Sequence, residues 1–238
     1  GVSSFEPGLA ATVPHSLWAI YQGMFAVITT ALITGAFAER LKFKALIVFT
    51  IIWSTVVYSP VAHWVWAPGG WIFDLGALDF AGGTVVHIAS GYAALVAAVL
   101  VGHRVAFGKQ EMLPHNLTYT VLGAAFLWFG WFGFNAGSAW AADAIAANAF
   151  VVTHTAAAMA AISWVAAQWW REGRPRVLGG AAGAVAGLVA ITPAAGYVTP
   201  GSAIIIGFVA GILCYLGLGF VKDRLKVDDA LDVFAVHG

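Results

Sequence analysis

All eleven Lys and Arg residues of the 238-residue chain fall into four short clusters, and long stretches with little charge separate them. The clusters are Arg40/Lys42/Lys44, Arg104/Lys109, Arg171/Arg174/Arg176 and Lys222/Arg224/Lys226. The alternate connections, near residues 68–79, 140–143 and 193–202, contain no Lys or Arg, and neither does segment 1–15. Cytoplasmic loops of membrane proteins are enriched in Lys and Arg. The pattern therefore predicts a multi-pass membrane protein whose clusters are cytoplasmic and whose N-terminal end and alternate connections lie outside.

The composition agrees with a chain embedded in lipid. Hydrophobic residues make up 61% of it and charged residues 9%, whereas a soluble domain has about 25% charged residues. The formal net charge is zero, so we expect no basic surface for nucleic acid. Cys214 is the single cysteine, so disulfides do not contribute to the fold.

Apolar stretches predict where the helices lie, because about 20 helical residues span the hydrocarbon core of a bilayer. Seven full crossings are predicted at 16–38, 45–67, 80–102, 117–141, 144–170, 177–197 and 202–221, with a truncated eighth at 230–238. Such continuous runs are unlike the alternating strands of a membrane barrel. The predicted fold class is all-α, a polytopic membrane helical bundle. Because the chain opens on Gly and stops inside a predicted helix, we expect a fragment of a longer protein.

An echo in the sequence suggests an inverted repeat. The letters ALD at 77–79 are followed by a Val-His pair that ends at His87. The same letters ALD recur at 230–232 and are followed by a second Val-His pair, which ends at His237. The spacing from Asp to His is eight residues in the first case and five in the second. The two histidine-bearing helices are predicted to run in opposite directions, as in inverted-topology repeats, whose substrate path lies at the repeat interface.

Three histidines lie well inside predicted crossings, away from the outer end where His63 stands, and ionisable side chains at such depth are costly and usually face a cavity or a partner. They are His87, His154 and His237. By helical rise, His87 lies roughly 12 Å from the outer end of its helix and His237 at most about 16 Å from the inner face, so the two can meet near mid-membrane. Paired neutral imidazoles can hydrogen-bond each other and still offer a polar edge to a pore. The alternative is that each histidine is a packing residue with its own partner.

Aromatic residues are arranged by depth near the outer face. Trp66 ends the second crossing, Ser138 lies about 7 Å inward from Asp143, and Phe134 lies about one turn deeper, at the depth of Phe25. An aromatic face beside a hydroxyl predicts a site for a small cation, and two phenyl rings beneath it predict a hydrophobic constriction. In a chain so rich in aromatic residues, chance alignment is the alternative.

Several long motifs, in the right order and across nearly the whole chain, resemble the ammonium transporter family (Amt/Mep, related to the Rh proteins). They are Tyr21–Arg40 (YQGMFAVITTALITGAFAER), Pro60–Trp66 (PVAHWVW), Asp79–His87 (DFAGGTVVH), Gly130–Ala139 (GWFGFNAGSA), Thr192–Tyr197 (TPAAGY) and Asp232–Gly238 (DVFAVHG).

The resemblance implies an external ammonium-recruitment site at Phe25, Trp66 and Ser138. It also implies a stacked phenyl gate formed by Phe25 and Phe134. Asp79 matches a family aspartate that supports the recruitment site from behind without binding substrate.

Deeper in the pore, the resemblance implies a pair of histidines at His87 and His237, with Trp131 as a pore-lining tryptophan. The family forms homotrimers of eleven-helix subunits, built from two inverted five-helix repeats plus one helix. The chain would then hold the third to ninth helices and the start of the tenth.

Two positions depart from the family pattern: Ala89 and His154 each stand where many members have Asn. His154 is either a second polar group near the pore or a hydrogen-bonding replacement for Asn, and we favour the replacement.

The implied function is that of an ammonium transporter or channel subunit of the plasma membrane, not an enzyme, with ammonium or ammonia as substrate and no cofactor. A bare cation would cross a dry pore at high cost, so deprotonation or a proton relay is expected before passage. The bilayer, further copies of the chain and a cytoplasmic regulatory protein of the PII type are the implied partners. Two alternatives stay open: an ammonium sensor of the same fold fused to a signalling domain, and a membrane metalloprotein with His87 and His237 as ligands.

Overall fold

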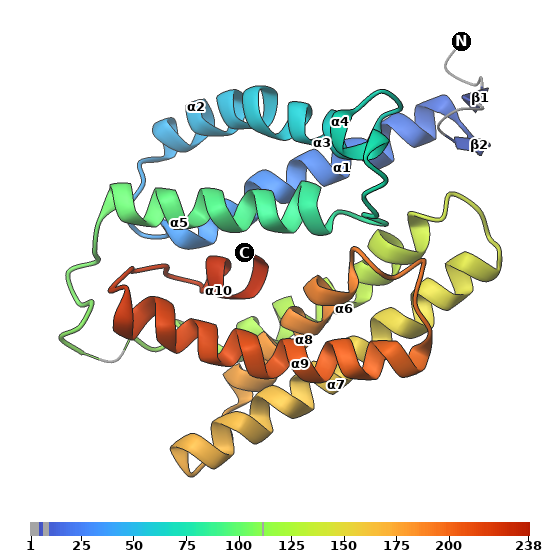
Figure 1. The fold of residues 1–238 in the computed structure, drawn as a ribbon. Helices are drawn as coiled ribbons and strands as arrows, with labels where there is room; N and C mark the ends of the chain where they lie inside the picture. The colour runs from blue at the N-terminus through green and yellow to red at the C-terminus, as the bar shows by residue number, and fades with distance from the viewer. Residues whose placement is uncertain (1–4, 7–9, 111) are drawn as a thin grey trace.

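The computed structural model describes residues 5–6, 10–110 and 112–238, and most of this backbone is helical (Figure 1). The first half contains α1 (His15–Ile33) with the 3₁₀ turn η1 (Thr34–Ala36), then α2 (Phe43–Trp53), the π-helical η2 (Ser54–Tyr58), α3 (Ser59–Trp66), α4 (Trp71–Asp74), the π-helical η3 (Gly83–Ile88) and α5 (Ala89–Val101). The second half contains α6 (Leu117–Gly137), α7 (Ala144–Glu172), α8 (Val177–Ile191), α9 (Pro200–Gly219), the π-helical η4 (Phe220–Arg224) and α10 (Val233–His237). Two short strands, β1 (Phe5–Glu6) and β2 (Ala10–Pro14), pair antiparallel before α1.

Six helical segments of the described chain are long and apolar enough to cross a membrane. They are His15–Ala36, Phe43–Asp74, Gly83–Val101, Leu117–Gly137, Ala144–Glu172 and Pro200–Arg224. The remaining predicted crossing, 177–197, corresponds to α8, which has only 15 residues. It ends at Ile191 because Pro193 has no N–H to continue the helix. Residues 192–197 continue as turns instead, with the Ala194 N–H donating to Ile191 O.

Other helix ends also differ from the predicted ranges for local reasons. Segment 117–141 was predicted as helix, but α6 ends at Gly137 because the next N–H groups bond three residues back and Trp140 adopts a positive φ of 57°. The third crossing starts at Gly83 rather than at residue 80, after a turn capped by Asp79. The last helix starts at Val233 rather than 230, because Asp232 has a φ of 60°.

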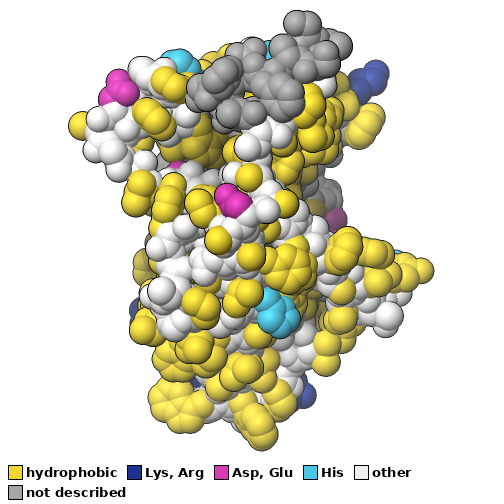
Figure 2. Space-filling model, turned by 90° about the vertical axis from the view of Figure 1, so that its right-hand side faces the viewer, with side chains coloured by type: hydrophobic (Ala, Val, Ile, Leu, Met, Phe, Trp, Pro, Cys, Tyr) yellow, Lys and Arg dark blue, Asp and Glu magenta, His cyan; other side chains and the backbone are white. Residues whose placement is uncertain are grey.

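The connections between helices alternate between the two ends of the bundle (Figure 1). One end holds β1, β2 and segments 67–82, 138–143 and 192–199, and the other holds 37–42, 102–110, 112–116, 173–176 and 225–232. All eleven Lys and Arg residues lie in this second set of connections or in the adjoining helical turns. Figure 2 views the bundle from the first end, where hydrophobic side chains are prominent and few Lys or Arg side chains are visible.

The helices form two packed groups with α10 between them (Figure 1). In the first group, buried side chains of α1, α3, η3 and α5 form one apolar cluster. In the second, α7 packs closely against α8 and α9, because Gly183 and Gly207 bring the two helices against the α7 backbone at Ala160 and Ala156. Small residues at such contacts allow the backbones of membrane helices to approach closely. The candidate site lies between the two groups.

Ion pairs and hydrogen bonds of buried Asp228 connect three segments at the Lys- and Arg-rich end of the bundle. The Asp228 carboxylate is fully buried and accepts hydrogen bonds from the Arg104 side chain, with Nη2 at 2.7 Å from Oδ1 and Nε at 3.0 Å from Oδ2. Arg40 Nη1 lies 3.6 Å from Asp228 Oδ2, and its guanidinium also donates to Ala36 O and Gly102 O. These contacts join the end of α1 and the end of α5 to the segment that leads into α10.

Candidate functional site

A line of aromatic and imidazole rings runs through the interior between the two helix groups. Trp66 meets Phe25 edge-on with ring centroids 5.6 Å apart, and Phe25 meets Phe134 at 4.6 Å. Phe134 lies 6.0 Å from His87, and His87 lies 5.0 Å from His237. The structure thus brings together five of the predicted site residues, from five helical segments, in one continuous row.

The row begins at a cavity of about 270 Å³ at the end of the bundle that carries β1 and β2. The residues predicted for recruitment, Phe25, Trp66 and Ser138, all line it. The prediction did not include the other lining residues, which are Trp18, Gln22, Pro68, Phe73, Phe80 and Trp140. Aromatic faces and one hydroxyl therefore converge on a space large enough for a small cation.

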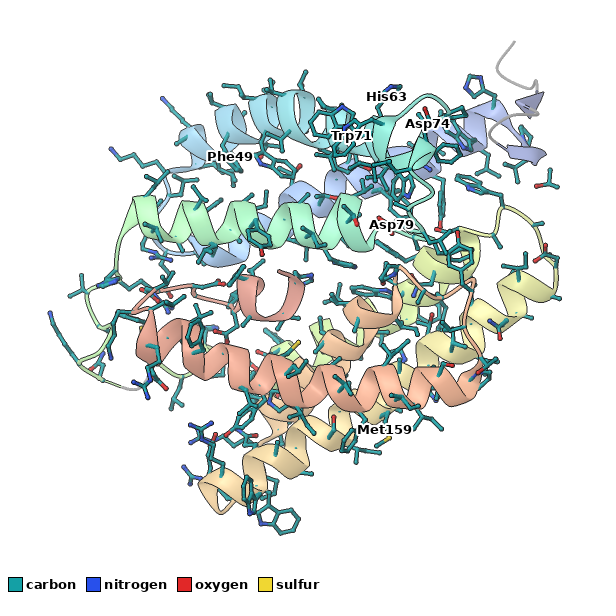
Figure 3. The ribbon with its side chains drawn as sticks, in the orientation of Figure 1. Phe49, His63, Trp71, Asp74, Asp79 and Met159 are labelled. Atoms are coloured by element: carbon teal, nitrogen blue, oxygen red, sulfur yellow. The ribbon has the colours of Figure 1, made fainter. Side chains whose placement is uncertain are left out.

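Asp79 supports this cavity without lining it. Its Oδ1 accepts from the N–H groups of Gly82 and Gly83 at 2.7 and 2.6 Å, and its Oδ2 accepts from Thr84 and Val85 at 2.8 and 3.1 Å. Both carboxylate oxygens are therefore occupied in capping η3. The backbone carbonyl of Asp79 accepts from the indole Nε1 of Trp66 at 2.8 Å and so orients that ring. Figure 3 places Asp79 at the loop just before η3.

The two phenyl rings and Trp131 form the next layer. The planes of Phe25 and Phe134 meet at 41°, so the contact is tilted, whereas the prediction was of stacked rings. Trp131 is buried and stacks on His87 with a centroid distance of 5.5 Å and an angle of 12°. Its Nε1 donates to Thr192 Oγ1 at 2.9 Å, which fixes the indole against the imidazole. Sequence reasoning missed Thr192, although it opens the TPAAGY motif.

His87 and His237 face each other through their Nδ1 atoms, which lie 2.9 Å apart. Both side chains are buried, at 2% and 8% exposure. One Nδ1 must carry the proton and the other must accept it, so the two rings are in different tautomers. His87 Nε2 is buried and has no hydrogen-bond partner among the described residues. It is therefore a polar edge that a molecule in the row could use.

The approach of the two histidines depends on Gly91, one helical turn beyond His87. A Cβ at this position would overlap the backbone of His237 and Gly238. Only glycine therefore lets the end of α10 lie directly against α5 at this height. Sequence analysis had no signal for this contact, because it joins residues almost 150 positions apart.

The two histidine-bearing segments are similar in the structure, but the sequence analysis paired Asp79 with the wrong aspartate. The residue equivalent to Asp79 is Asp229, not Asp232: Asp229 Oδ2 accepts from the Phe234 N–H at 2.7 Å, so Asp229 caps α10 as Asp79 caps η3. Asp229 precedes His237 by eight residues, the same spacing as between Asp79 and His87. Asp232 instead pairs with Lys222 at 2.5 Å. The equal spacing was visible in the sequence, but the repeated ALD letters drew attention to the wrong aspartate.

His154 does not join the row. It lies on an exposed face of α7, with its ring 5.4 Å from Trp128 and 6.2 Å from Phe132 on α6. Within the described part of the chain there is also no group of three or more His, Cys, Asp or Glu side chains placed to share a metal ion. Among the described residues, the metalloprotein alternative therefore has two candidate ligands and no third beside them.

Comparison with known proteins identifies relatives along almost the whole chain. The family model described as Ammonium Transporter Family matches residues 6–238. An ammonium transporter of Bacillus subtilis is 54% identical over 98% of this chain and 57% of its own length. The ammonium transporter Amt1 of Archaeoglobus fulgidus is 53% identical over 93% of this chain and 56% of its own length.

Solved structures agree with the sequence comparison. The crystal structure of Candida albicans Mep2 is 46% identical and superposes with a TM-score of 0.90 over 96% of this chain and 51% of that one. A structure titled "Sensor Amt Protein" is 35% identical, with a TM-score of 0.92 over 96% of this chain and 59% of that one. The chain thus spans little more than half the length of these relatives.

Proposed function

The chain belongs to the ammonium transporter family and is a multi-pass membrane protein, and on this basis we propose that it forms the pore-bearing part of an ammonium transporter. The observation that carries the proposal is the row of rings from Trp66 to His237, which joins an open cavity to a buried pair of imidazoles. The Bacillus subtilis and Archaeoglobus fulgidus relatives are named ammonium transporters, which supports reading the row of rings as the route of a substrate rather than as a catalytic site.

Recruitment begins in the cavity lined by Trp66, Phe25 and Ser138. Ammonium is a small cation with four N–H donors, so aromatic faces attract its charge and a hydroxyl oxygen accepts one of its hydrogen bonds. Asp79 acts from behind, because all of its oxygens are already engaged with backbone groups and with the indole of Trp66. The site therefore recruits the cation without a direct carboxylate ligand.

Passage then runs between Phe25 and Phe134 and along the two histidines. The contact of these two rings leaves little room for a hydration shell, and a bare cation pays a high desolvation penalty in such surroundings. Ammonia, as a neutral molecule, does not. We therefore assign to His87 and His237 the roles of proton relay and polar guide, with Trp131 as the flat wall beside them.

The orientation follows from the charges. The end that carries the eleven Lys and Arg residues is assigned to the cytoplasm, and the recruitment cavity to the outer face of the plasma membrane. We expect the complete protein to be a homotrimer and to meet a PII-type regulator at the cytoplasmic end. The sensor alternative is less favoured, since the relatives named as ammonium transporters are 53–54% identical and the sensor structure is 35% identical.

The recruitment role is tested by Trp66→Leu in the full-length parent protein, with ammonium uptake measured as a function of concentration. Cation–π contacts contribute on the order of 0.5–2 kcal/mol. The half-saturating concentration should therefore rise several-fold to about thirtyfold, with little change in maximal rate. Trp71→Leu is the matched control, because Trp71 is 58% exposed and does not line the cavity. An unchanged concentration dependence in Trp66→Leu would show that Trp66 only anchors the helix at the interface.

A further inference from the structure

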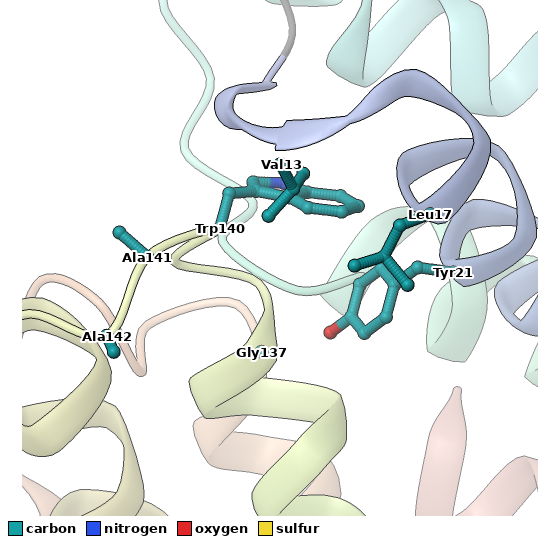
Figure 4. Close-up of a pocket in the computed structure, with 7 residues that line it drawn as sticks. All are labelled: Val13, Leu17, Tyr21, Gly137, Trp140, Ala141 and Ala142. Atoms are coloured by element: carbon teal, nitrogen blue, oxygen red, sulfur yellow. The ribbon is translucent and has the colours of Figure 1, made fainter. Parts of the chain in front are cut away.

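Two neighbouring tryptophans stand at the end of α7, in the Lys- and Arg-rich part of the bundle. Every other tryptophan of the chain has its ring within 6.5 Å of another aromatic or imidazole ring, as Trp140 has against Tyr21 beside an apolar pocket of about 300 Å³ (Figure 4). Trp169 and Trp170 have no such ring partner among the described residues, and they are 59% and 91% exposed. Packing within the described bundle therefore does not account for these two indoles.

The length of α7 carries the indoles to the edge of the hydrocarbon layer. The helix has 29 residues, or about 44 Å, whereas a hydrocarbon core is about 30 Å thick. Its ends therefore reach the headgroup layers even at an ordinary tilt of about 20°. The exposed residues Ile162, Ala166 and Trp169 follow one another at helical spacing, so they lie on one face. The indoles thus end an apolar stripe, at the depth where tryptophan is enriched in membrane proteins.

Glu172, the only acidic residue in segment 144–222, is engaged within the bundle. Its Oε1 accepts from the Tyr215 hydroxyl at 3.1 Å and from Gln168 Nε2 at 3.2 Å. Its Oε2 lies 3.0 Å from Arg176 Nε, at the start of α8. The carboxylate therefore joins the end of α7 to α8 and α9.

Arg171 and Arg174 are exposed at the same corner. No carboxylate of the described residues lies within ion-pair distance of either guanidinium. Gly173 ends α7 between them with a φ of 75°, and the chain turns back into α8. Figure 1 shows this turn at the rim of the bundle, away from the segment that leads into α10. Two positive charges without a carboxylate partner thus adjoin two uncovered indoles.

This combination matches the headgroup region of a phospholipid. A guanidinium donates a pair of N–H groups to phosphate oxygens. An indole favours the boundary between headgroups and acyl chains, because its ring is apolar and its N–H is polar. Basic segments are attracted to the anionic lipids of the cytoplasmic leaflet. A soluble partner bound to the arginines would leave uncovered the apolar stripe that Trp169 continues.

We propose that residues 169–171 and Arg174, here called the α7 corner, bind one anionic phospholipid of the leaflet at the Lys- and Arg-rich end. The arginines bind the headgroup phosphate, and the indoles pack at the level of the glycerol backbone. One acyl chain lies along Ile162 and Ala166. The α7 corner is separate from the row of rings, so this proposal does not depend on the proposed route of ammonium.

The first test titrates the full-length parent protein in detergent with phosphatidylglycerol, or with phosphatidylcholine of the same acyl chains. Native mass spectrometry gives the dissociation constant of each bound lipid. Each arginine near an anionic surface contributes roughly a fivefold factor, so Arg171→Gln/Arg174→Gln should weaken phosphatidylglycerol binding roughly 25-fold. Phosphatidylcholine binding should stay unchanged. Arg224→Gln/Lys226→Gln is the matched control, because it removes two exposed positive charges from the same end where no tryptophan adjoins them in sequence.

The second test separates the indole from the charges. Trp170→Ser should weaken the binding of both lipids, because the ring packs against glycerol and acyl groups that the two lipids share. The arginine variant should affect the anionic lipid alone. Val105→Ser is the control, since Val105 is 88% exposed in another connection at the same end, and it should affect neither lipid.

Four results would overturn the proposal. Wild-type phosphatidylglycerol affinity in Arg171→Gln/Arg174→Gln is the first, and an equal loss in the Arg224→Gln/Lys226→Gln control is the second, because it would show an effect of net charge only. The third is binding of glycerol 3-phosphate as tight as that of the lipid, which would assign the corner to a soluble anion. The fourth is an arginine variant that keeps its lipid but no longer binds a PII-type regulator. None of these measurements uses transport, so the proposed function stands or fails separately.

Discussion

The Nδ1 atoms of His87 and His237 lie 2.9 Å apart, at the meeting point of two short helical segments that are each capped by an aspartate eight residues earlier. Asp79 caps the first segment and Asp229 the second. Two imidazolium ions at this distance in an apolar interior would repel each other strongly, so at most one ring can be charged at a time. This geometry suits the proposed relay, in which a proton passes along the pair while the pair stays hydrogen-bonded.

Replacing one histidine should change what crosses more than whether the protein folds. In His87→Ala, the remaining imidazole can bond to water in the space left behind, while the relay and the polar guide are both lost. We expect altered proton coupling or cation selectivity, measured as ammonium-driven current and competing potassium flux in proteoliposomes. His154→Ala is the control, because His154 is exposed and outside the row. Wild-type coupling and selectivity in His87→Ala would contradict the proposed relay.

A methyl group at Gly91 should disrupt the pair without touching either ring. The added Cβ would overlap the backbone of His237 and Gly238, and relieving such overpacking typically costs about 1–3 kcal/mol. We expect Gly91→Ala to insert into the membrane but to transport much more slowly than wild type. Gly123→Ala, where nothing lies within 4 Å of the added Cβ, should behave as wild type. Normal transport by Gly91→Ala would mean that the histidine contact is not required.

Accessibility of single cysteines tests the orientation. In a Cys214→Ala background, a cysteine at Ala77 should react with impermeant reagents only from outside, and one at Gln110 only from the cytoplasm. Both positions are exposed, so substitution does not disturb packing. Labelling of Ala77→Cys from the cytoplasmic side would reverse the assignment.

The buried Asp228 should make stability depend on pH in the acid range. Burial alone would raise the pKa of Asp228, but hydrogen bonds and charge from Arg104, with the charge of Arg40, hold it below its ordinary value. Because the pKa of Asp228 is lower in the folded than in the unfolded protein, its ionisation stabilises the fold at pH values above the unfolded pKa of about 3.9. This stabilisation is lost as the pH falls through the folded pKa. Asp228→Asn should therefore lower the melting temperature at pH 7, and its deficit should shrink below about pH 4.

Asp223→Asn, at an exposed position of η4, is the control and should leave the melting temperature unchanged. Ionisation of Asp229 is expected to destabilise the fold instead, because burial raises its pKa although the N–H groups of Phe234 and Val233 lower it. A pH-independent deficit in Asp228→Asn would show that packing, and not charge, makes Asp228 important.

Much of the architecture was readable without coordinates. Lys and Arg clusters at alternate loops predicted how often the chain turns back, and the structure gathers all of them at one end of the bundle. The helix ends were predicted less well, as at Ile191 and Gly137, because a proline or a change from i−4 to i−3 hydrogen bonding ends a helix inside a run that stays apolar. The candidate residues were found through motifs, since hydropathy alone does not distinguish Phe25 from any other buried phenylalanine.

Sequence by itself determined the fold class and the alternating direction of the helices, because each segment's partition between lipid and water depends on its own composition. It also identified His87 and His237 as candidate residues, through the motifs that contain them. Only the tertiary structure decided that Asp229 is the counterpart of Asp79, that Gly91 admits the end of α10, and that Thr192 fixes the indole of Trp131. The Gly91 contact joins residues almost 150 positions apart, and the Thr192 contact joins residues about 60 positions apart. They depend on how closely helix backbones pack and on which terminal carbonyl or N–H group is left without a partner, and neither quantity is a property of a local stretch of chain.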